Sequence, residues 1–175
     1  MKKTLLAIAL VASSAVASSA FASDGSVNFK GSITDAACTV DTASKNQDVF
    51  LGDISRKAFP VAGSLAAAKK FTLVLTGCPD TVTGAVVRFD GTQAPGDNSI
   101  LALTEETDAA TGVGVQISDS TGKVVPLYED SSRYDLSSTG ANNLEFSARY
   151  ISLVGMDDVT VGPANAVTQF TIDYR

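Results

Sequence analysis

Just beyond its first two dozen positions the chain alternates strictly between hydrophobic and polar residues. From Gly25 to Ile33 the sequence GSVNFKGSI places glycine, valine, phenylalanine and isoleucine on one face and serine, asparagine and lysine on the other. A period of two is typical of a β-strand that buries one face. We therefore predict an N-terminal strand in this segment.

Similar short runs recur along the rest of the chain, separated by turn-forming glycine, proline, aspartate and asparagine residues. They predict strands at 48–51, 69–76, 85–89, 100–103, 113–117, 123–127, 144–154 and 167–174. Many short strands with frequent turns indicate an all-β fold in a single domain. One helical turn is expected at 64–70, and the polar stretch 129–143 is expected to be an exposed loop.

The first 22 residues have the pattern of a secretory signal peptide. Two lysines precede an apolar run at 5–12, and a stretch of small residues ends at Ala22. Such a segment directs export, and its apolar run is too short to span a bilayer. Cleavage is predicted between Ala22 and Ser23, with an earlier cut after Ala17 or an uncleaved N-terminal core helix as the alternatives. No later apolar run approaches 18 residues, so no membrane insertion is expected.

Composition narrows the chemistry that the exported chain can perform. The sequence has no His, no Trp and two Cys, with 13 Lys and Arg against 19 Asp and Glu. Without His there is no Ser-His-Asp or Cys-His pair and no His-bearing zinc or copper site, so no catalytic residue, metal or cofactor is predicted. Loss of the two signal lysines takes the net charge from −6 to −8, which disfavours nucleic acid and anionic membranes as partners.

Cys38 and Cys78 are expected to form a disulfide bond. In the oxidising compartment that an exported chain reaches, two cysteines most simply pair with each other. The bond would close a loop of about 40 residues, which the chain-entropy treatment makes worth roughly 4 kcal/mol. A catalytic thiol is the alternative, and the lack of His and of a C-x-x-C motif disfavours it.

The two ends of the exported chain carry the functional argument. Its N-terminal strand must dock on something to be ordered, and the partner is either its own domain or another chain. At the other end the segment 167–174 alternates again, and the chain stops at Arg175. This last strand either belongs to a complete sandwich or leaves an open edge for another chain to cover.

A series of motifs occurs in a fixed order along the whole exported chain. They are Val27-x-Phe29-x-Gly31-x-Ile33, Ala36-Ala37-Cys38, Leu51-Gly52, Phe71-x-Leu73-x-Leu75-x-Gly77-Cys78, Phe146-x-Ala148-Arg149-Tyr150, Gly162 fourteenth from the end, and the penultimate Tyr174. Each motif is weak alone, whereas the ordered set is specific. Together they resemble the major subunits of fimbriae assembled by the chaperone–usher pathway, the type 1 fimbrial family.

The resemblance implies an incomplete immunoglobulin-like β-sandwich. Residues 36–175 would form the sandwich without its last strand, and residues 23–35 would form a donor-strand arm. In this family a periplasmic chaperone fills the open groove with a strand of its own, and at an outer-membrane usher the arm of the next subunit replaces it. Such β-augmentation takes its affinity from main-chain hydrogen bonds and its selectivity from alternate side chains.

On the arm, the resemblance implies that Val27, Phe29 and Ile33 are the buried side chains. Gly31 would lie where the groove is shallow, while simple flexibility or a bulge is the alternative for this glycine. The exact register of the arm is left open.

On the acceptor side, the resemblance implies that Gly162, Phe170, Ile172 and Tyr174 belong to the strand beside the groove. Ordinary core packing is an alternative for Phe170 and Ile172, and both roles can hold together. The Arg175 carboxylate would be the group that a chaperone grips. For Arg149 the sequence does not choose between an ion pair and a solvent-reaching side chain.

We therefore interpret the sequence as a non-enzymatic structural subunit of a bacterial surface fimbria that supports adhesion. Its expected partners are copies of itself, other pilus subunits, the chaperone and the usher, and its route is through the periplasm to the cell surface. A minor or adapter subunit is one alternative. A secreted monomeric β-sandwich that binds a ligand such as a glycan is another, although the absence of Trp disfavours a sugar-stacking surface.

Overall fold

The structure is a computed structural model, and it describes residues 24–31, 33 and 37–175. Contacts divide the chain after Ile33, so the arm (residues 24–31 and 33) and the body (residues 37–175) are described separately. Ala22 and Ser23 lie outside the described residues, and the cleavage site stays a prediction. Within the described ranges, no helix is both long and apolar enough to cross a membrane.

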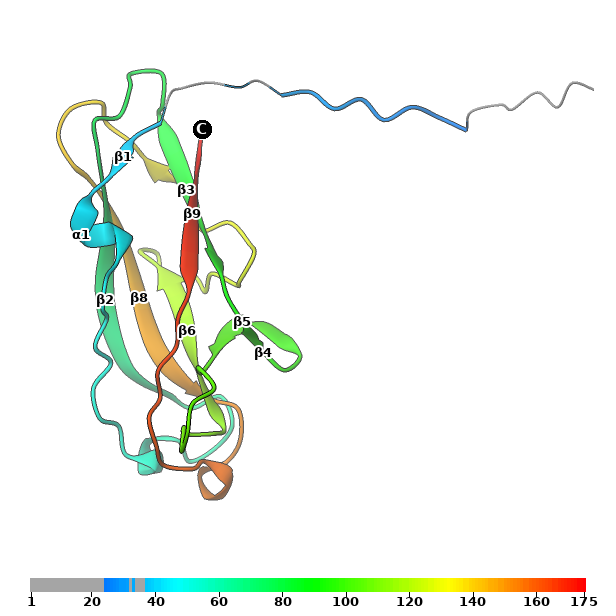
Figure 1. The fold of residues 1–175 in the computed structure, drawn as a ribbon, viewed down its shortest axis with the longest axis vertical. Coiled ribbons are helices and arrows are strands. Elements are labelled where there is room, and N and C mark those ends of the chain that lie inside the picture. Colours follow the sequence, from blue (N-terminus) through cyan, green and yellow to red (C-terminus); the bar gives the residue numbers. More distant parts are fainter. Residues whose placement is uncertain (1–23, 32, 34–36) are drawn as a thin grey trace, which may run out of the picture. The chain divides into compact units, whose positions relative to one another are not determined.

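The body is built from two antiparallel β-sheets, as Figure 1 shows. In spatial order the larger sheet contains β1 (Thr39–Val40), β2 (Leu65–Thr76), β8 (Asn142–Ser152), β6 (Val113–Asp119), β5 (Asp97–Ala102) and β4 (Gln93–Ala94). The smaller sheet contains β7 (Tyr134–Asp135), β3 (Gly84–Asp90) and β9 (Gln169–Tyr174). The expectation of an all-β fold is confirmed.

Aromatic rings join the two sheets in the core. Phe89 of β3 meets Phe146 of β8 edge to face, with ring centroids 5.1 Å apart. Phe71 of β2 stacks on Phe146 at 5.6 Å. Phe89 and Phe146 are almost fully buried, and each buried ring contributes roughly 1.5–3 kcal/mol of hydrophobic stabilisation. The inward positions of the alternating strands therefore form one common core.

The disulfide bond between Cys38 and Cys78 closes the start of the body. It joins the residue before β1 to the segment just after β2, where Thr39 already pairs with Thr76. Both cysteines are buried in the core. The pairing expected from the sequence is confirmed.

Three local predictions are wrong. The helical turn expected at 64–70 is instead the first half of β2, where Leu65 pairs with Ile151 and Lys70 with Ser147, because strand pairing overrides the helix propensity of an alanine-rich run. Residues 48–51 form no strand. Residues 123–127 contribute only an isolated bridge between Ser118 and Val124.

Short elements were also missed. A single helical turn, α1 (Thr42–Lys45), follows β1, and Asp41 caps it by accepting a hydrogen bond from the Ala43 amide. Two 3₁₀ turns lie at Arg56–Ala58 and Met156–Asp158. The expected loop at 129–143 contains β7 and the first residues of β8. The described arm residues have no regular secondary structure.

Candidate functional site

Two segments of the body run beside the core without a strand partner. The first is 47–54, which follows α1, and the second is 159–168, which leads into β9 (Figure 1). Among the described residues, no backbone N–H group of 47–54 or of 161–167 donates a hydrogen bond. Backbone groups rarely stay unpaired away from water. The N–H groups of both segments are therefore available to another strand, although the carbonyl oxygens of Pro163, Ala164 and Asn165 already accept hydrogen bonds from the body.

A groove lies between the two segments. It has a volume of about 1580 Å³, and both segments line it. Much of its remaining wall is apolar and comes from the core, although Ser44, Lys45, Asn46, Arg56 and Gln169 also line it. The core residues are Phe71, Leu73, Phe89, Leu101, Val113, Val115, Ile117, Ala148 and Tyr150. The groove therefore has a lining that suits an extended strand with apolar side chains.

Exposed apolar side chains mark the rim of the groove. Phe50 on the first segment is 81% exposed, and Val161 and Val167 on the second are 79% and 73% exposed. Scattered surface hydrophobic residues are ordinary, whereas a contiguous apolar surface indicates a binding site. Here the three side chains flank an opening onto the hydrophobic core.

The arm carries exposed apolar side chains. Val27 is 79% exposed, and Phe29 and Ile33 are more than nine-tenths exposed. A Cβ built on Gly31 would meet nothing within 4 Å, so its described surroundings give no reason for a glycine there. The apolar side chains expected from the alternation are thus exposed, and the described arm residues belong to no strand.

Phe170, Ile172 and Tyr174 point inward from β9. They alternate with exposed Thr171 and half-buried Asp173, and all three pack against the core. Phe170 also lines the groove. The core-packing interpretation therefore applies to Phe170 and Ile172, which lie opposite Phe89 and Val87 of β3. Burial raises the pKa of the Tyr174 phenol, whose hydroxyl donates a hydrogen bond to the Cys38 carbonyl oxygen.

Gly162 lies where the second groove segment crosses the chain at Asp108 to Ala110. A Cβ on Gly162 would overlap the Asp108 carbonyl oxygen and approach the Ala110 nitrogen to 2.8 Å. These are backbone atoms, so they cannot move aside as a side chain can. The glycine therefore lets the groove wall lie against this loop, whose Ala110 amide bonds to the Pro163 carbonyl oxygen at 2.8 Å.

The C-terminal residue is anchored at the start of β3. The Arg175 amide donates to the Gly84 carbonyl oxygen at 2.7 Å, and the Arg175 backbone oxygen accepts from the Thr83 and Gly84 amides at 3.1 Å each. The terminus that sequence reasoning singled out as a chaperone contact is thus already held by its own chain.

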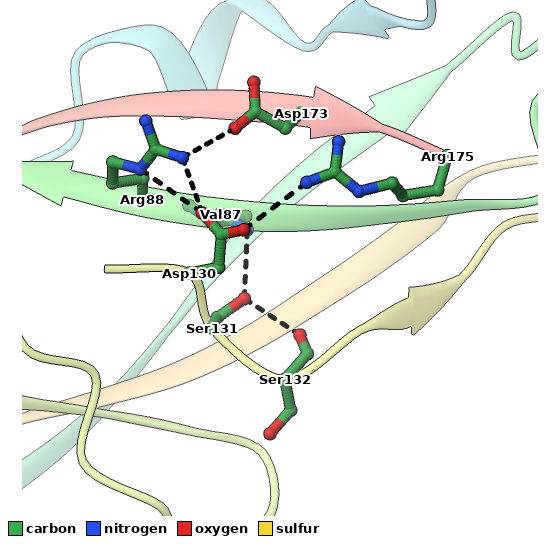
Figure 2. A network of polar contacts seen from close by, with 7 residues as sticks. All are labelled: Val87, Arg88, Asp130, Ser131, Ser132, Asp173 and Arg175. Atoms are coloured by element: carbon green, nitrogen blue, oxygen red, sulfur yellow. Dashed lines mark hydrogen bonds and ion pairs between the residues drawn. The ribbon is translucent and has the colours of Figure 1, made fainter. Parts of the chain in front are cut away.

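Sequence reasoning missed a polar network on the outer face of the smaller sheet, which Figure 2 shows. The Arg88 guanidinium contacts Asp130 at 2.7 Å and Asp173 at 3.1 Å, and Arg175 contacts Asp130 at 3.4 Å. The hydrogen bond with Asp130, and then the charge of the same carboxylate, raises the pKa of Arg88. The only available signal was the outward position of Arg88 on β3 and of Asp173 on β9.

Within the described body, Arg149 adopts neither of the two arrangements that the sequence left open, an ion pair or a solvent-reaching side chain. Its Nη2 donates to the Ser118 hydroxyl at 2.7 Å, and it makes no ion pair with any residue in the described part of the chain. Its buried Nε has no hydrogen-bond partner there. Arg149 is therefore a partly satisfied structural cation on the larger sheet.

Known proteins resemble the chain over its full length. A family model described as "Fimbrial protein" matches residues 27–175. The chain is 35% identical over 184 residues to a type-1 fimbrial protein subunit of Serratia marcescens, covering 100% of both proteins. It is 35% identical over 177 residues to long polar fimbria protein A of Salmonella typhimurium, covering 100% of the chain and 98% of that relative.

Solved structures give the same picture of the fold. The P pilus rod subunit PapA superposes with a TM-score of 0.67 at 20% identity, covering 79% of this chain and 99% of that one. An antigen and type I fimbria protein of Burkholderia pseudomallei superposes with a TM-score of 0.61 at 35% identity, covering 86% and 97%. The two-sheet body is thus an immunoglobulin-like sandwich of the kind found in pilus subunits.

Proposed function

The chain belongs to the fimbrial protein family, and from that premise we propose that its copies join by donor-strand exchange, the arm of one filling the groove of the next. It is a structural subunit of a chaperone–usher fimbria, exported to the cell surface. The family is structural and is not a class of enzymes. The finer proposal concerns which residues make the joint.

One observation carries the proposal: the same chain has an apolar groove between two segments that lack a strand partner and an arm with exposed alternating apolar side chains. An inserted strand would pair its backbone with 47–54 on one side and with 159–168 on the other. Burying Val27, Phe29 and Ile33 would contribute roughly 1.5–3 kcal/mol for each side chain. Burial of these residues would therefore supply several kcal/mol before the cost of ordering the arm.

Arm and groove are different surfaces of one chain, so the contact between copies is heterologous. Such a contact repeats without closing unless the rotation happens to form a ring, and it therefore builds a filament. We place the arm at residues 23–35 and the body at 36–175, with Ser23 as the first residue after signal cleavage. The assembly needs no cofactor, because the free energy comes from burying the groove.

Before assembly, a chaperone strand would have to cover the same groove, because an open edge over an apolar core invites aggregation. Gly162, Phe170, Ile172 and Tyr174 would then lie beside the chaperone strand. A basic group of the chaperone could bind the Arg175 carboxylate only alongside, or in place of, the Thr83 and Gly84 amides that already hold its backbone oxygen.

Deletion of residues 24–31 tests the proposal when the chain is produced together with its chaperone. The shortened chain should still form a soluble complex with the chaperone, because its groove is intact. It should accept the arm of a full-length copy but donate to none, so that it ends every filament. Filaments built from the shortened chain alone would contradict the proposal.

A further inference from the structure

The C-terminal strand β9 has a strand neighbour on one edge only. Within the described body it pairs with β3, from Ala85 opposite Tyr174 to Asp90 opposite Gln169. The segment that precedes it, 161–167, donates no backbone hydrogen bond to a described residue. A short edge strand that is joined to a segment without a strand partner is expected to open easily. Besides the core packing of its inner face and the backbone bonds of Arg175, a further set of contacts holds β9 in register while the groove is empty.

The polar network reaches β9 from the far side of β3. Asp130 lies along the β3 edge that does not pair with β9, and it is fixed there by its neighbour Ser131. The Ser131 amide donates to the Val87 carbonyl oxygen, and the Val87 amide donates to the Ser131 hydroxyl, both at 2.9 Å. The Ser131 hydroxyl in turn donates to the Ser132 carbonyl oxygen. Figure 2 shows this anchored loop beneath the two arginines.

Two routes of ion pairs connect Asp130, on one side of β3, with the end of β9 on the other side. Arg88 on β3 bonds to Asp130 on one side and to Asp173 of β9 on the other. Arg175, one residue beyond β9, returns across β3 to the second oxygen of Asp130. The four charges alternate in sign along this chain of contacts. They therefore tie the last three residues of the molecule to a loop that β3 already holds.

None of these four residues lines the groove. Arg88 follows Val87 and precedes Phe89, which face the core, so its side chain is on the outer face of the sheet. Asp173 has the same position between Ile172 and Tyr174. The network therefore cannot contact a strand inside the groove, and it can act on one only through β9.

We propose that Asp173, Arg88, Asp130 and Arg175 form a clasp that keeps β9 in register while the groove is empty, and that the clasp thereby sets how fast the groove accepts a strand from another copy. This inference rests on the proposed function. The four are positioning residues. An incoming strand pairs readily with β9 only if the backbone of β9 is already ordered. If β9 is disordered, binding must also supply the conformational entropy cost of ordering it.

The clasp matters most before the groove is filled. Its side chains are between a third and a half exposed, so such pairs contribute little to global stability. The local opening of a frayed edge strand is governed by far fewer contacts. Once a second strand pairs with β9, the backbone hydrogen bonds of that strand keep β9 in register instead. Loss of the clasp should therefore affect the empty form much more than the filled form.

The test uses the full mature chain with Val27→Asp and Phe29→Asp in its arm, so that the chain keeps its length but cannot donate. Into this background go Arg88→Gln, Asp173→Asn or the matched control Asp135→Asn. Asp135 lies on β7 in the same sheet, and its contact with Arg133 at 3.4 Å does not involve β9. The added strand is a synthetic peptide with the sequence from Asp24 to Thr34, and each chain is studied with and without it.

Hydrogen–deuterium exchange at 170–174 and the association rate of the peptide are the two readouts. Arg88→Gln should speed exchange in the empty chain and slow peptide association by about fivefold each. Dissociation of the peptide, and exchange in the filled chain, should change less than about twofold. Arg88→Lys, which keeps the charge, should recover part of both effects, and Asp135→Asn should change neither.

Two results would overturn the clasp: variants that behave like Asp135→Asn, or variants that alter the empty and filled forms equally, as a purely structural role would. A background chain that takes up no peptide would instead contradict donor-strand exchange, and with it the kinetic half of this proposal. Exchange in the empty chain would still decide whether the four residues hold β9.

Discussion

The Tyr174 hydroxyl donates a hydrogen bond to the Cys38 carbonyl oxygen at 3.3 Å, across a sequence separation of 136 residues. It joins the penultimate residue of the chain to the cysteine that begins the body. Cys38 is itself fixed by its disulfide bond to Cys78. The C-terminal end of β9 is therefore held on both faces: Tyr174 makes this hydrogen bond on the inner face, and Asp173 and Arg175 make ion pairs on the outer face.

Tyr174→Phe should destabilise the body without disturbing its fold. The variant keeps the ring that packs on the core and loses one hydrogen bond, so the free energy of unfolding should fall by about 0.5–1.5 kcal/mol. Denaturant unfolding of the two chains measures the difference. Thr171→Val, an exposed change on the opposite face of β9, is the control. Equal stability of Tyr174→Phe and the parent chain would show that the hydrogen bond has no net effect.

The environment of Asp119 determines how acid affects the stability of the protein. Its carboxylate is buried and accepts hydrogen bonds from the Thr121 hydroxyl at 2.6 Å and from the Thr121, Lys123 and Ser132 amides. Burial alone raises the pKa of Asp119, but the hydrogen bonds from Ser132 and Thr121 outweigh burial, and the net pKa is lowered. The charged form is thus favoured in the folded state.

The sign of the pH effect follows from that direction. A carboxyl whose pKa is lowered by folding adds stability above its unfolded pKa of about 3.9, and this stability is lost as the pH falls through the folded pKa. Asp119→Asn should lower the free energy of unfolding at pH 7 by about 1–3 kcal/mol and flatten its decline below about pH 4. Urea unfolding from pH 2 to 7 measures both. A variant with the same acid slope as the parent chain would contradict this role.

Gly162→Ala tests the close approach at the groove wall. The added methyl group meets backbone atoms at Asp108 and Ala110, so the free energy of unfolding should fall by about 1–3 kcal/mol as the wall shifts. Gly155→Ala is the matched control, because a Cβ there meets nothing within 4 Å, and it should change stability by less than about 0.5 kcal/mol. Similar losses in both variants would show that the contact at Gly162 is not responsible.

Alternation located the strands whose inner face is buried by the opposite sheet. On β8, buried residues such as Leu144 and Phe146 occupy every second position, as the sequence displays, whereas on β3 the run from Gly84 to Val87 is buried throughout. The pattern cannot show which strand lies beside which. For that reason the alanine-rich start of β2 was expected to be helical, although its pairing with β8 makes it a strand.

The segments predicted as strands but found without partners are informative for a different reason. Residues 48–51, which are mostly apolar, and the alternating arm around Phe29 were both predicted as strands, yet neither belongs to a sheet in the single chain. If donor-strand exchange joins the subunits, both patterns describe the assembled state, in which each segment gains a partner. The clasp could not be predicted, because Arg88 and Asp130 are 42 residues apart and outward charges have no recognisable spacing.

Donor-strand exchange is tested most directly by the thermal unfolding of the full mature chain carrying Val27→Asp and Phe29→Asp, with and without the peptide from Asp24 to Thr34. A peptide that fills the groove at a hundred times its dissociation constant adds about 2.7 kcal/mol, which for a domain of this size raises the melting temperature by about 5–10 °C. A control peptide with aspartate in place of Val27 and Phe29 should leave the melting temperature unchanged. No shift with the native peptide, or an equal shift with both peptides, would contradict the account.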